Sequence, residues 1–304
     1  MKKPSLILVT GAAGGNQGST GNHVARLLNE KNVPVRAFVH SIDERSDQLS
    51  RPGIEIVEGD LLNYQSVKAA MEGVQRAYFT YAVKDGLMEA TTIFAMAAKE
   101  CGVEMVVNIS QLLERNGEQH TPHQERHWLA EHVFDWAGIG AVHLNAVVFF
   151  ENLRALVKPG LSKGDTFFLP WGPEKTKIPM ISAEDVARIA VALLTGPLQP
   201  NGIIIPLIGD VVTVGEIKDT LAEVLEKPVN YTEITDAQWM DAVSKHGQLN
   251  DKALEHLSHL WRHFRTRSKE YQDAYAITPA TETLTGNRPK LLREFLEEQK
   301  QVFA

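Results

Sequence analysis

The sequence predicts an α/β fold, a doubly wound parallel sheet accompanied by a second, smaller and mostly helical domain. In the first half of the chain, short apolar runs rich in β-branched residues alternate with longer amphipathic stretches, the pattern of repeated βα units. The first apolar run ends in a glycine-rich turn that leads directly into a helix. Near residue 150 the pattern changes to short Pro- and Gly-rich segments, and after about residue 201 to mainly helical stretches.

Each predicted strand of the first half is bounded by Gly, Pro or Asn, which interrupt regular structure. The strands are expected at 5–10, 33–39, 54–57, 76–80, 105–109 and 140–146. The helices between them are expected at 21–29, 66–72, 87–101 and 124–137. Further along the chain, helices are expected at 182–194, 214–225, 236–244, 251–264 and 290–300.

The helix at 182–194 decides the domain boundaries. Its small and apolar residues are typical of a helix that covers a sheet, so it should return to the larger domain. We therefore expect residues 1–150 and about 180–200 to form the larger domain, and residues 151–179 and 201–304 to form the smaller one. The smaller domain should cap the carboxyl ends of the strands.

The composition and net charge of the chain exclude some classes of binding partner. The chain has 31 Lys and Arg against 38 Asp and Glu, a net charge of −7, so we expect neither nucleic-acid binding nor electrostatic attraction to anionic membranes. The single cysteine excludes an intramolecular disulfide framework. No apolar run reaches the roughly 20 residues of a membrane span, and the N-terminal run is too short for a secretory signal. We expect a cytoplasmic protein with a small-molecule substrate, and leave open whether it forms a homo-oligomer.

The glycine-rich turn is the most informative motif, and it reads TGAAGGNQGSTG from Thr10 to Gly21. Glycines let a chain turn tightly and let backbone N–H groups approach a pyrophosphate, while the helix N-terminus adds partial positive charge. The turn is similar to a GxxGxxG motif with extra residues in its middle. We therefore predict a dinucleotide site that includes Gly11, Gly14, Asn16, Gln17 and Gly18.

The end of the second strand bears on the choice of cofactor. An NAD site normally places an acidic residue there to bind the ribose hydroxyls, but this chain carries His40 and Ser41, followed by Arg45. These side chains suit the 2′-phosphate of NADPH, which we expect as the cofactor. In the alternative, Asp43 turns toward the ribose, Arg45 is a solvated loop cation, and the cofactor is NADH.

Residues that follow the other strands should line the same edge of the sheet, where ligands bind in open α/β folds. Asp60, with Leu61 beside it, would hold the adenine amino group after the third strand. Thr80 and Tyr81 should line the pyrophosphate or ribose after the fourth strand. Gln111 should reach the cofactor after the fifth.

Four segments besides the glycine turn resemble the NmrA-like family of atypical short-chain dehydrogenases/reductases. They are 59–61 (GDL), 149–153 (FFENL), 227–239 (KPVNYTEITDAQW) and 284–289 (LTGNRP), the last followed by Phe295. The resemblance covers nearly the whole chain and implies an NAD(P)-binding Rossmann fold. It also implies one of two activities. One is the NADPH-dependent reduction of quinones, dyes or other unsaturated small molecules, and the other is dinucleotide binding by a regulator without turnover.

Short-chain dehydrogenases use a tyrosine and a lysine four residues apart, and no such pair occurs on the corresponding helix here. His123 and His127 have that spacing and share one helical face. By the resemblance, His127 matches a lysine or histidine near the nicotinamide ribose, where it would orient the ribose and donate a proton near neutral pH. The alternative is a surface histidine paired with Glu131. Ser110 falls at the place of the usual catalytic serine and would bond a substrate oxygen, unless its hydroxyl caps the next loop.

The acceptor pocket should involve Val148, Phe149, Phe150 and Trp171, because aromatic faces suit a flat apolar molecule. The alternative is that these residues form ordinary core between the domains. Where the family has an Arg-Pro pair, this chain has Asn145-Ala146, a departure that weakens any transfer of substrate identity.

Two histidine triplets, at 120, 123 and 127 and at 256, 259 and 263, have a spacing that places imidazoles on one helix face. Pro122 should prevent the first triplet from lying on one continuous helix. The second triplet alternates with residues that are typical of a core. Packing explains both triplets, so no metal is expected.

These observations favour an NAD(P)H-dependent oxidoreductase that transfers hydride to a small quinone-, enone- or imine-like acceptor. The alternative is a non-catalytic NADPH-binding redox sensor that acts through a protein partner. Epimerase chemistry on a nucleotide sugar is disfavoured, because that class also relies on the missing tyrosine and lysine.

Overall fold

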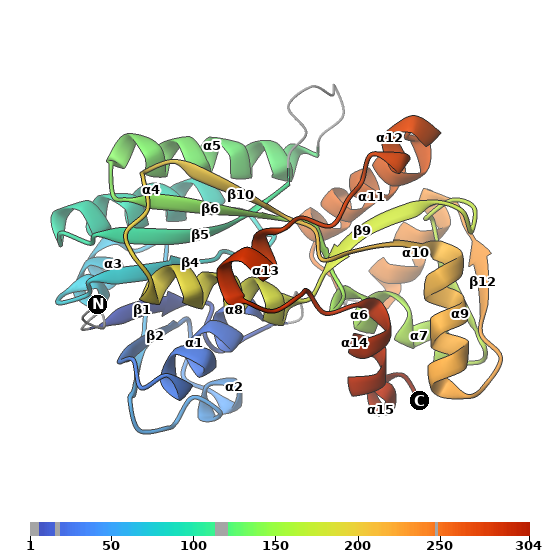
Figure 1. The fold of residues 1–304 in the computed structure, drawn as a ribbon, viewed down its shortest axis with the longest axis horizontal. Helices are drawn as coiled ribbons and strands as arrows, with labels where there is room; N and C mark the ends of the chain where they lie inside the picture. Colours follow the sequence, from blue (N-terminus) through green and yellow to red (C-terminus); the bar gives the residue numbers. More distant parts are fainter. Residues whose placement is uncertain (1–5, 16–18, 113–120, 247–248) are drawn as a thin grey trace.

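The computed structural model describes residues 6–15, 19–112, 121–246 and 249–304, which form a larger and a smaller unit (Figure 1). The larger unit contains a seven-stranded sheet whose strands are β1 (Ile7–Thr10), β2 (Val35–Val39), β3 (Ile54–Glu58), β4 (Arg76–Phe79), β5 (Met105–Gln111), β6 (Ala141–Ala146) and β10 (Ile203–Leu207). Their order is β10-β6-β5-β4-β1-β2-β3, and every pair of neighbours is parallel. The predicted doubly wound parallel sheet is confirmed. Its order reverses between β1 and β4, which opens a crevice at the carboxyl ends of the strands.

Helices cover both faces of this sheet, because its strands are apolar on both sides. The helices are α1 (Thr20–Glu30), α2 (Glu44–Asp47), α3 (Tyr64–Met71), α4 (Leu87–Glu100), α5 (Pro122–Ala137) and α8 (Ala183–Thr195). α1 and α8 pack together on one face, and α3, α4 and α5 form a layer on the other (Figure 1). None of the helices in the described ranges is long and apolar enough to cross a membrane.

The start of α5 is fixed by local chemistry. The Thr121 hydroxyl accepts the backbone N–H of Gln124, and the Gln124 side chain accepts the backbone N–H of Thr121, which is a reciprocal capping box. Pro122 occupies the first helical position, where its missing N–H is not needed. Gly138, with φ at 66° in the left-handed region, ends the helix. This geometry orients the α5 side chains that face the carboxyl edge of β5.

The smaller unit contains two short sheets, with orders β11-β9-β7 and β12-β8, packed against helices. Its strands are β7 (Val148–Phe149), β8 (Thr166–Leu169), β9 (Lys177–Ile181), β11 (Asp210–Thr213) and β12 (Asn230–Glu233). Its helices are α6 (Asn152–Leu156), α7 (Lys158–Leu161), α9 (Val214–Leu225), α10 (Asp236–His246), α11 (Asp251–Thr266), α12 (Lys269–Asp273), α14 (Leu292–Glu298) and α15 (Lys300–Phe303). We predicted the longer helices but none of these strands, since they are too short to show an alternating pattern.

We had expected the whole chain after residue 200 to belong to the smaller unit, but two of its segments return to the larger one. β10 pairs with β6 as the seventh strand of the large sheet, and α13 (Ala280–Thr285) packs on α8. The reason is local: the run of three isoleucines at 203–205 has the apolar, β-branched character of a parallel strand. The larger unit therefore takes segments from both halves of the sequence.

Candidate functional site

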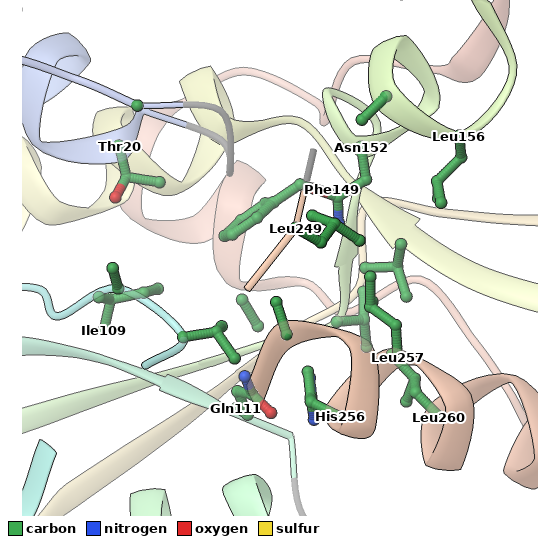
Figure 2. A pocket seen from close by; sticks show the side chains of 18 of the residues that line it. Thr20, Ile109, Gln111, Phe149, Asn152, Leu156, Leu249, His256, Leu257 and Leu260 are labelled. Atoms are coloured by element: carbon green, nitrogen blue, oxygen red, sulfur yellow. The ribbon is translucent and has the colours of Figure 1, made fainter. Parts of the chain in front are cut away.

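A cavity of about 990 Å³ lies at the carboxyl ends of the central strands and continues between the two units (Figure 2). At one end it is lined by the glycine turn and the start of α1. At the other end its wall comes from β7, α6, α11 and the residues just before α11. Its apolar side chains there are Phe149, Leu156, Leu249, Leu257 and Leu260. No Asp or Glu lines it among the described residues. The cavity is large enough for a dinucleotide's reactive end together with a small apolar ligand.

The glycine turn leaves space that side chains would fill. Gly11 has φ at +63°, and a Cβ added to it would lie 2.6 Å from Cγ2 of Thr80. Gly14 also has a positive φ, at +78°. A Cβ on Gly21 would lie 2.3 Å from the carbonyl oxygen of Thr10, so only glycine lets α1 pack this closely against β1.

The N-terminus of α1 is suited to an anion. Its N-cap residue Ser19 has a left-handed backbone and no side-chain cap bond, and the first turn contains no acidic residue. Backbone N–H groups and the positive end of the helix dipole therefore face the cavity. The turn and α1 fit the pyrophosphate of a dinucleotide. Of the other predicted contacts, Asn16, Gln17 and Gly18 lie outside the described residues.

The predicted adenosine-side residues do not line the cavity as the structure describes it; they are His40, Ser41, Arg45, Asp60 and Leu61. They lie just beyond the carboxyl ends of β2 and β3. Arg45 pairs with Asp43, and this guanidinium holds the pKa of the Asp43 carboxyl below its usual value. The two residues that favour different cofactors therefore bind each other, which the sequence alone did not indicate.

The predicted residues after the other strands do line the cavity; they are Thr80, Tyr81, Ser110 and Gln111. The backbone N–H of Thr80 donates to Oγ1 of Thr10 at 2.8 Å, which ties β4 to β1 below the glycine turn. Burial raises the pKa of the Tyr81 hydroxyl, which donates to the carbonyl of Asp85.

Three buried histidines meet where α5 faces α11. The rings of His123 and His127 lie 4.8 Å apart, and the ring of His256 lies 5.1 Å from that of His123. His127 and His256 line the cavity, whereas His123 lies behind them. Nδ1 of His127 and Nε2 of His123 have no hydrogen-bond partner within the described part of the chain. This cluster was not predicted, because His256 reaches α5 from the other unit.

Burial keeps these imidazoles neutral. It lowers the pKa of His123 to about 4 and that of His256 to about 3, and it holds the pKa of His127 well below its usual value. A neutral imidazole at His127 can hydrogen-bond a ribose hydroxyl, but it does not supply a proton as an imidazolium near neutral pH. The low pKa of His127 therefore argues against the proton-donating role expected for it, and the orienting role stays a prediction.

The histidines of the two triplets that the structure describes are not grouped as metal ligands. His123 and His127 lie on α5 and His120 is outside the described residues, while the second triplet lies along α11. The ranges that the structure describes contain no group of three or more His, Cys, Asp or Glu side chains placed to hold a metal ion.

We expect the histidine cluster to make the protein acid-sensitive. Below about pH 6.5 the unfolded chain binds protons that the folded chain excludes, so the free energy of unfolding falls as the pH drops from 6.5 toward 4. In a His256→Leu variant, the loss between pH 6.5 and pH 5 should be about 1.6 kcal/mol smaller than in the wild type, because the unfolded imidazole goes from half to nearly full protonation over this range. Urea unfolding at the two pH values measures this difference. An equal loss in both proteins would contradict it. His132→Gln is the control, since His132 lies on α5 but outside the histidine cluster.

A buried carboxyl lies behind Ser110, and we did not predict its role. The Ser110 hydroxyl donates to Oε1 of Glu131 at 2.5 Å, and both residues are 2% exposed. Burial raises the pKa of Glu131. Glu131 is therefore no surface partner of His127. The sequence did contain a signal for this burial, because Glu131 follows His127 by one helical turn and lies between the apolar positions Ala130 and Phe134.

The predicted acceptor residues divide into two pairs. Val148 and Phe149 line the cavity, but Phe150 and Trp171 do not. Phe150 stacks on Phe295, with ring centroids 5.4 Å apart, in the core of the smaller unit. Phe150 lies in the turn just after β7, and its ring packs in this core and not in the wall of the cavity.

Trp171 also belongs to that core. Its ring lies 5.5 Å from that of Trp261, and it is 1% exposed. The apolar wall of the cavity comes instead from leucines of α11, which sequence analysis had assigned only to a helix.

Comparison with known proteins agrees with this fold. A model of the NmrA-like family matches residues 3–296. The NAD(P)H azoreductase of Xenophilus azovorans is 27% identical over 245 residues, which cover 80% of this chain and 82% of that protein. The structure of an NADPH-dependent quinone oxidoreductase, QOR2, complexed with NADPH from Escherichia coli has a TM-score of 0.80 at 21% identity, and covers 97% of this chain and 99% of its own.

The structure of NmrA, a negative transcriptional regulator, in complex with NAD has a TM-score of 0.78 at 17% identity, and covers 98% of this chain and 95% of its own. At these identities the structural likenesses show a shared fold. The same architecture therefore carries both reductases and a regulator.

Proposed function

The chain belongs to the NmrA-like family, and from this membership and the geometry of its site we propose that it is an NAD(P)H-dependent reductase. Its acceptor is a small, flat and apolar molecule with a quinone-, enone-, imine- or azo-like double bond. The observation that carries the proposal is a cavity that joins the glycine turn to an apolar wall, with no acidic side chain lining it among the described residues. The azoreductase relative supports the same class of reaction.

We propose NADPH as the preferred cofactor and NADH as the weaker one. No acidic side chain follows β2 directly, since His40 and Ser41 occupy the positions after Val39. The quinone oxidoreductase of the same fold was crystallised with NADPH. Release of Arg45 from Asp43 would give a 2′-phosphate a cation of the right charge.

Each part of the site has one task in this reaction. Backbone amides around Gly11 and Gly14 and the N-terminus of α1 hold the pyrophosphate, and the neutral ring of His127 orients the ribose. The reduced nicotinamide supplies a hydride when it is bound. Leu257 and Leu260 exclude water and hold the acceptor against the nicotinamide ring. Ser110 at the end of β5 donates a hydrogen bond to the acceptor.

Titration with NADPH and NADH, followed by acceptor assays, tests the proposal. The wild type should bind NADPH more tightly and oxidise it with at least one member of a panel comprising a benzoquinone, a cyclic enone, an imine and an azo dye. His127→Leu should raise the Kd for NADPH about 10-fold, the worth of one hydrogen bond. His132→Gln, on the same helix but outside the cavity, should bind as the wild type does.

Each failure has a distinct meaning. Binding of NADPH without turnover across the panel would contradict the reductase and favour the redox sensor. Absence of binding by either nucleotide would contradict the assignment of the glycine turn.

A further inference from the structure

The wall of the cavity contains a serine backed by a buried acid. Ser110 lines the cavity at the end of β5, and its Oγ lies 2.5 Å from Oε1 of Glu131 on α5. Glu131 does not line the cavity itself. Any effect of its carboxyl on a ligand therefore passes through the hydroxyl of Ser110.

The surroundings of Glu131 act on its pKa in both directions, and burial, which raises the pKa, is the largest influence. The side-chain amide of Asn145 on β6 also hydrogen-bonds this carboxyl, and no salt bridge to Glu131 occurs within the described residues. Two titratable groups act on it, His143 of β6 and Asp135 of α5, and these pair with each other at 2.9 Å. An ionised carboxyl without a cation is expensive to bury, so burial raises its pKa.

The proposed reaction needs a proton as well as a hydride, and the two donors expected from the sequence do not supply it. The helix that carries the proton-relay tyrosine and lysine in short-chain dehydrogenases has neither residue here. His127, the other candidate, is kept neutral by burial. The hydroxyl of Ser110 is too weak an acid to donate its proton at neutral pH, unless a neighbouring acid transfers a proton to it in turn.

We propose that Glu131 is the proton reservoir of this site and acts through Ser110, an inference that rests on the proposed reductase function. While one end of the acceptor double bond takes the hydride, the heteroatom at the other end takes the hydroxyl proton of Ser110. For this step the hydrogen bond between the two residues is reversed, so that the Ser110 hydroxyl donates to the acceptor and the protonated carboxyl of Glu131 donates to Oγ of Ser110. Ser110 then takes the proton of Glu131 in the same step, which leaves a carboxylate. After the product leaves, a proton from water returns through the open cavity by way of Ser110 to Glu131.

Infrared spectroscopy of the purified protein tests the first requirement without any turnover. The wild type at neutral pH should show the carbonyl stretch of a protonated carboxylic acid, and part of this band should disappear in Glu131→Gln. The band should titrate at a pH above that of an exposed glutamate. If Glu131→Gln removes no such band, Glu131 is ionised and the proposal is overturned.

Kinetics test the second requirement. Glu131→Gln should reduce kcat about 100-fold, within the range for general acids, while the Kd for NADPH changes less than twofold. The fall of the wild-type rate with rising pH should disappear in Glu131→Gln and persist in Glu131→Asp, which retains an acid. Unchanged kcat and pH dependence in Glu131→Gln would overturn the proposal.

Glu151 offers a matched control. It is also a buried acid, and burial raises its pKa to about 7, but it accepts the backbone N–H of Ala183 and does not line the cavity. Glu151→Gln should lose an infrared band of its own and keep the wild-type rate and pH dependence. A wild type that reduces no acceptor overturns the reductase function and this inference together, whereas an active Glu131→Gln overturns only the inference.

Discussion

Replacing Gly21 by alanine should raise the Kd for NADPH at least 100-fold and lower the free energy of unfolding by about 1–3 kcal/mol, the usual range for overpacking. The added Cβ would lie 2.3 Å from the carbonyl oxygen of Thr10 and 2.7 Å from the backbone of Gly11. These are backbone atoms of β1 and the turn, so they cannot rotate out of the way as a side chain would. α1 must move away from the sheet, and its N-terminus then no longer meets the pyrophosphate. Fluorescence titration and urea unfolding measure the two effects.

Gly164 provides the control for this experiment. A Cβ added there meets no atom within 4 Å, and the residue lies outside the cavity. Gly164→Ala should therefore retain both stability and NADPH affinity. Wild-type affinity in Gly21→Ala would show that the cofactor does not depend on the close approach of α1 to β1.

Replacing Leu257 by aspartate should reduce kcat/KM for the acceptor about 100-fold, equivalent to ~2.8 kcal/mol, and leave the Kd for NADPH within threefold. Leu257 lies in the apolar wall contributed by α11, on the side of the cavity away from the glycine turn (Figure 2). A carboxylate there would remain hydrated and would oppose the entry of an apolar molecule. Steady-state kinetics with varied acceptor and saturating NADPH measure the effect.

Two further substitutions at this position separate charge from shape. Leu257→Asn has nearly the shape of the aspartate without its charge and should lose less activity, while Leu257→Met should remain close to the wild type. If Leu257→Asp reduces the acceptor at the wild-type rate, the α11 wall does not bind the acceptor.

The sequence predicted those features that depend on neighbours along the chain. The glycine turn follows a strand and precedes a helix, so a role in dinucleotide binding could be proposed for it without any long-range contact. The same holds for Thr80 and Ser110, since each follows a predicted strand and parallel strands end at one edge of the sheet.

The missed features depend on contacts between distant segments. His256 reaches the α5 histidines from α11, more than a hundred residues away, and no periodicity in either helix reveals that meeting. The misplacement of Phe150 and Trp171 has a similar cause: sequence identifies an aromatic residue but not which side of β7 or which core it occupies. Glu131 was read as a surface acid because its burial depends on how α5 lies on β5 and β6.

The return of the chain to form β10 has a consequence for how the protein can be divided. A fragment that ended near residue 200 would retain every strand of the large sheet except its last, so the whole length of β6 would present unpaired backbone N–H and C=O groups. Such an open, apolar border is a template for pairing with other chains. The larger unit is thus not a separable module. During synthesis, the edge of the sheet at β6 stays unpaired until Leu207, the last residue of β10, has left the ribosome.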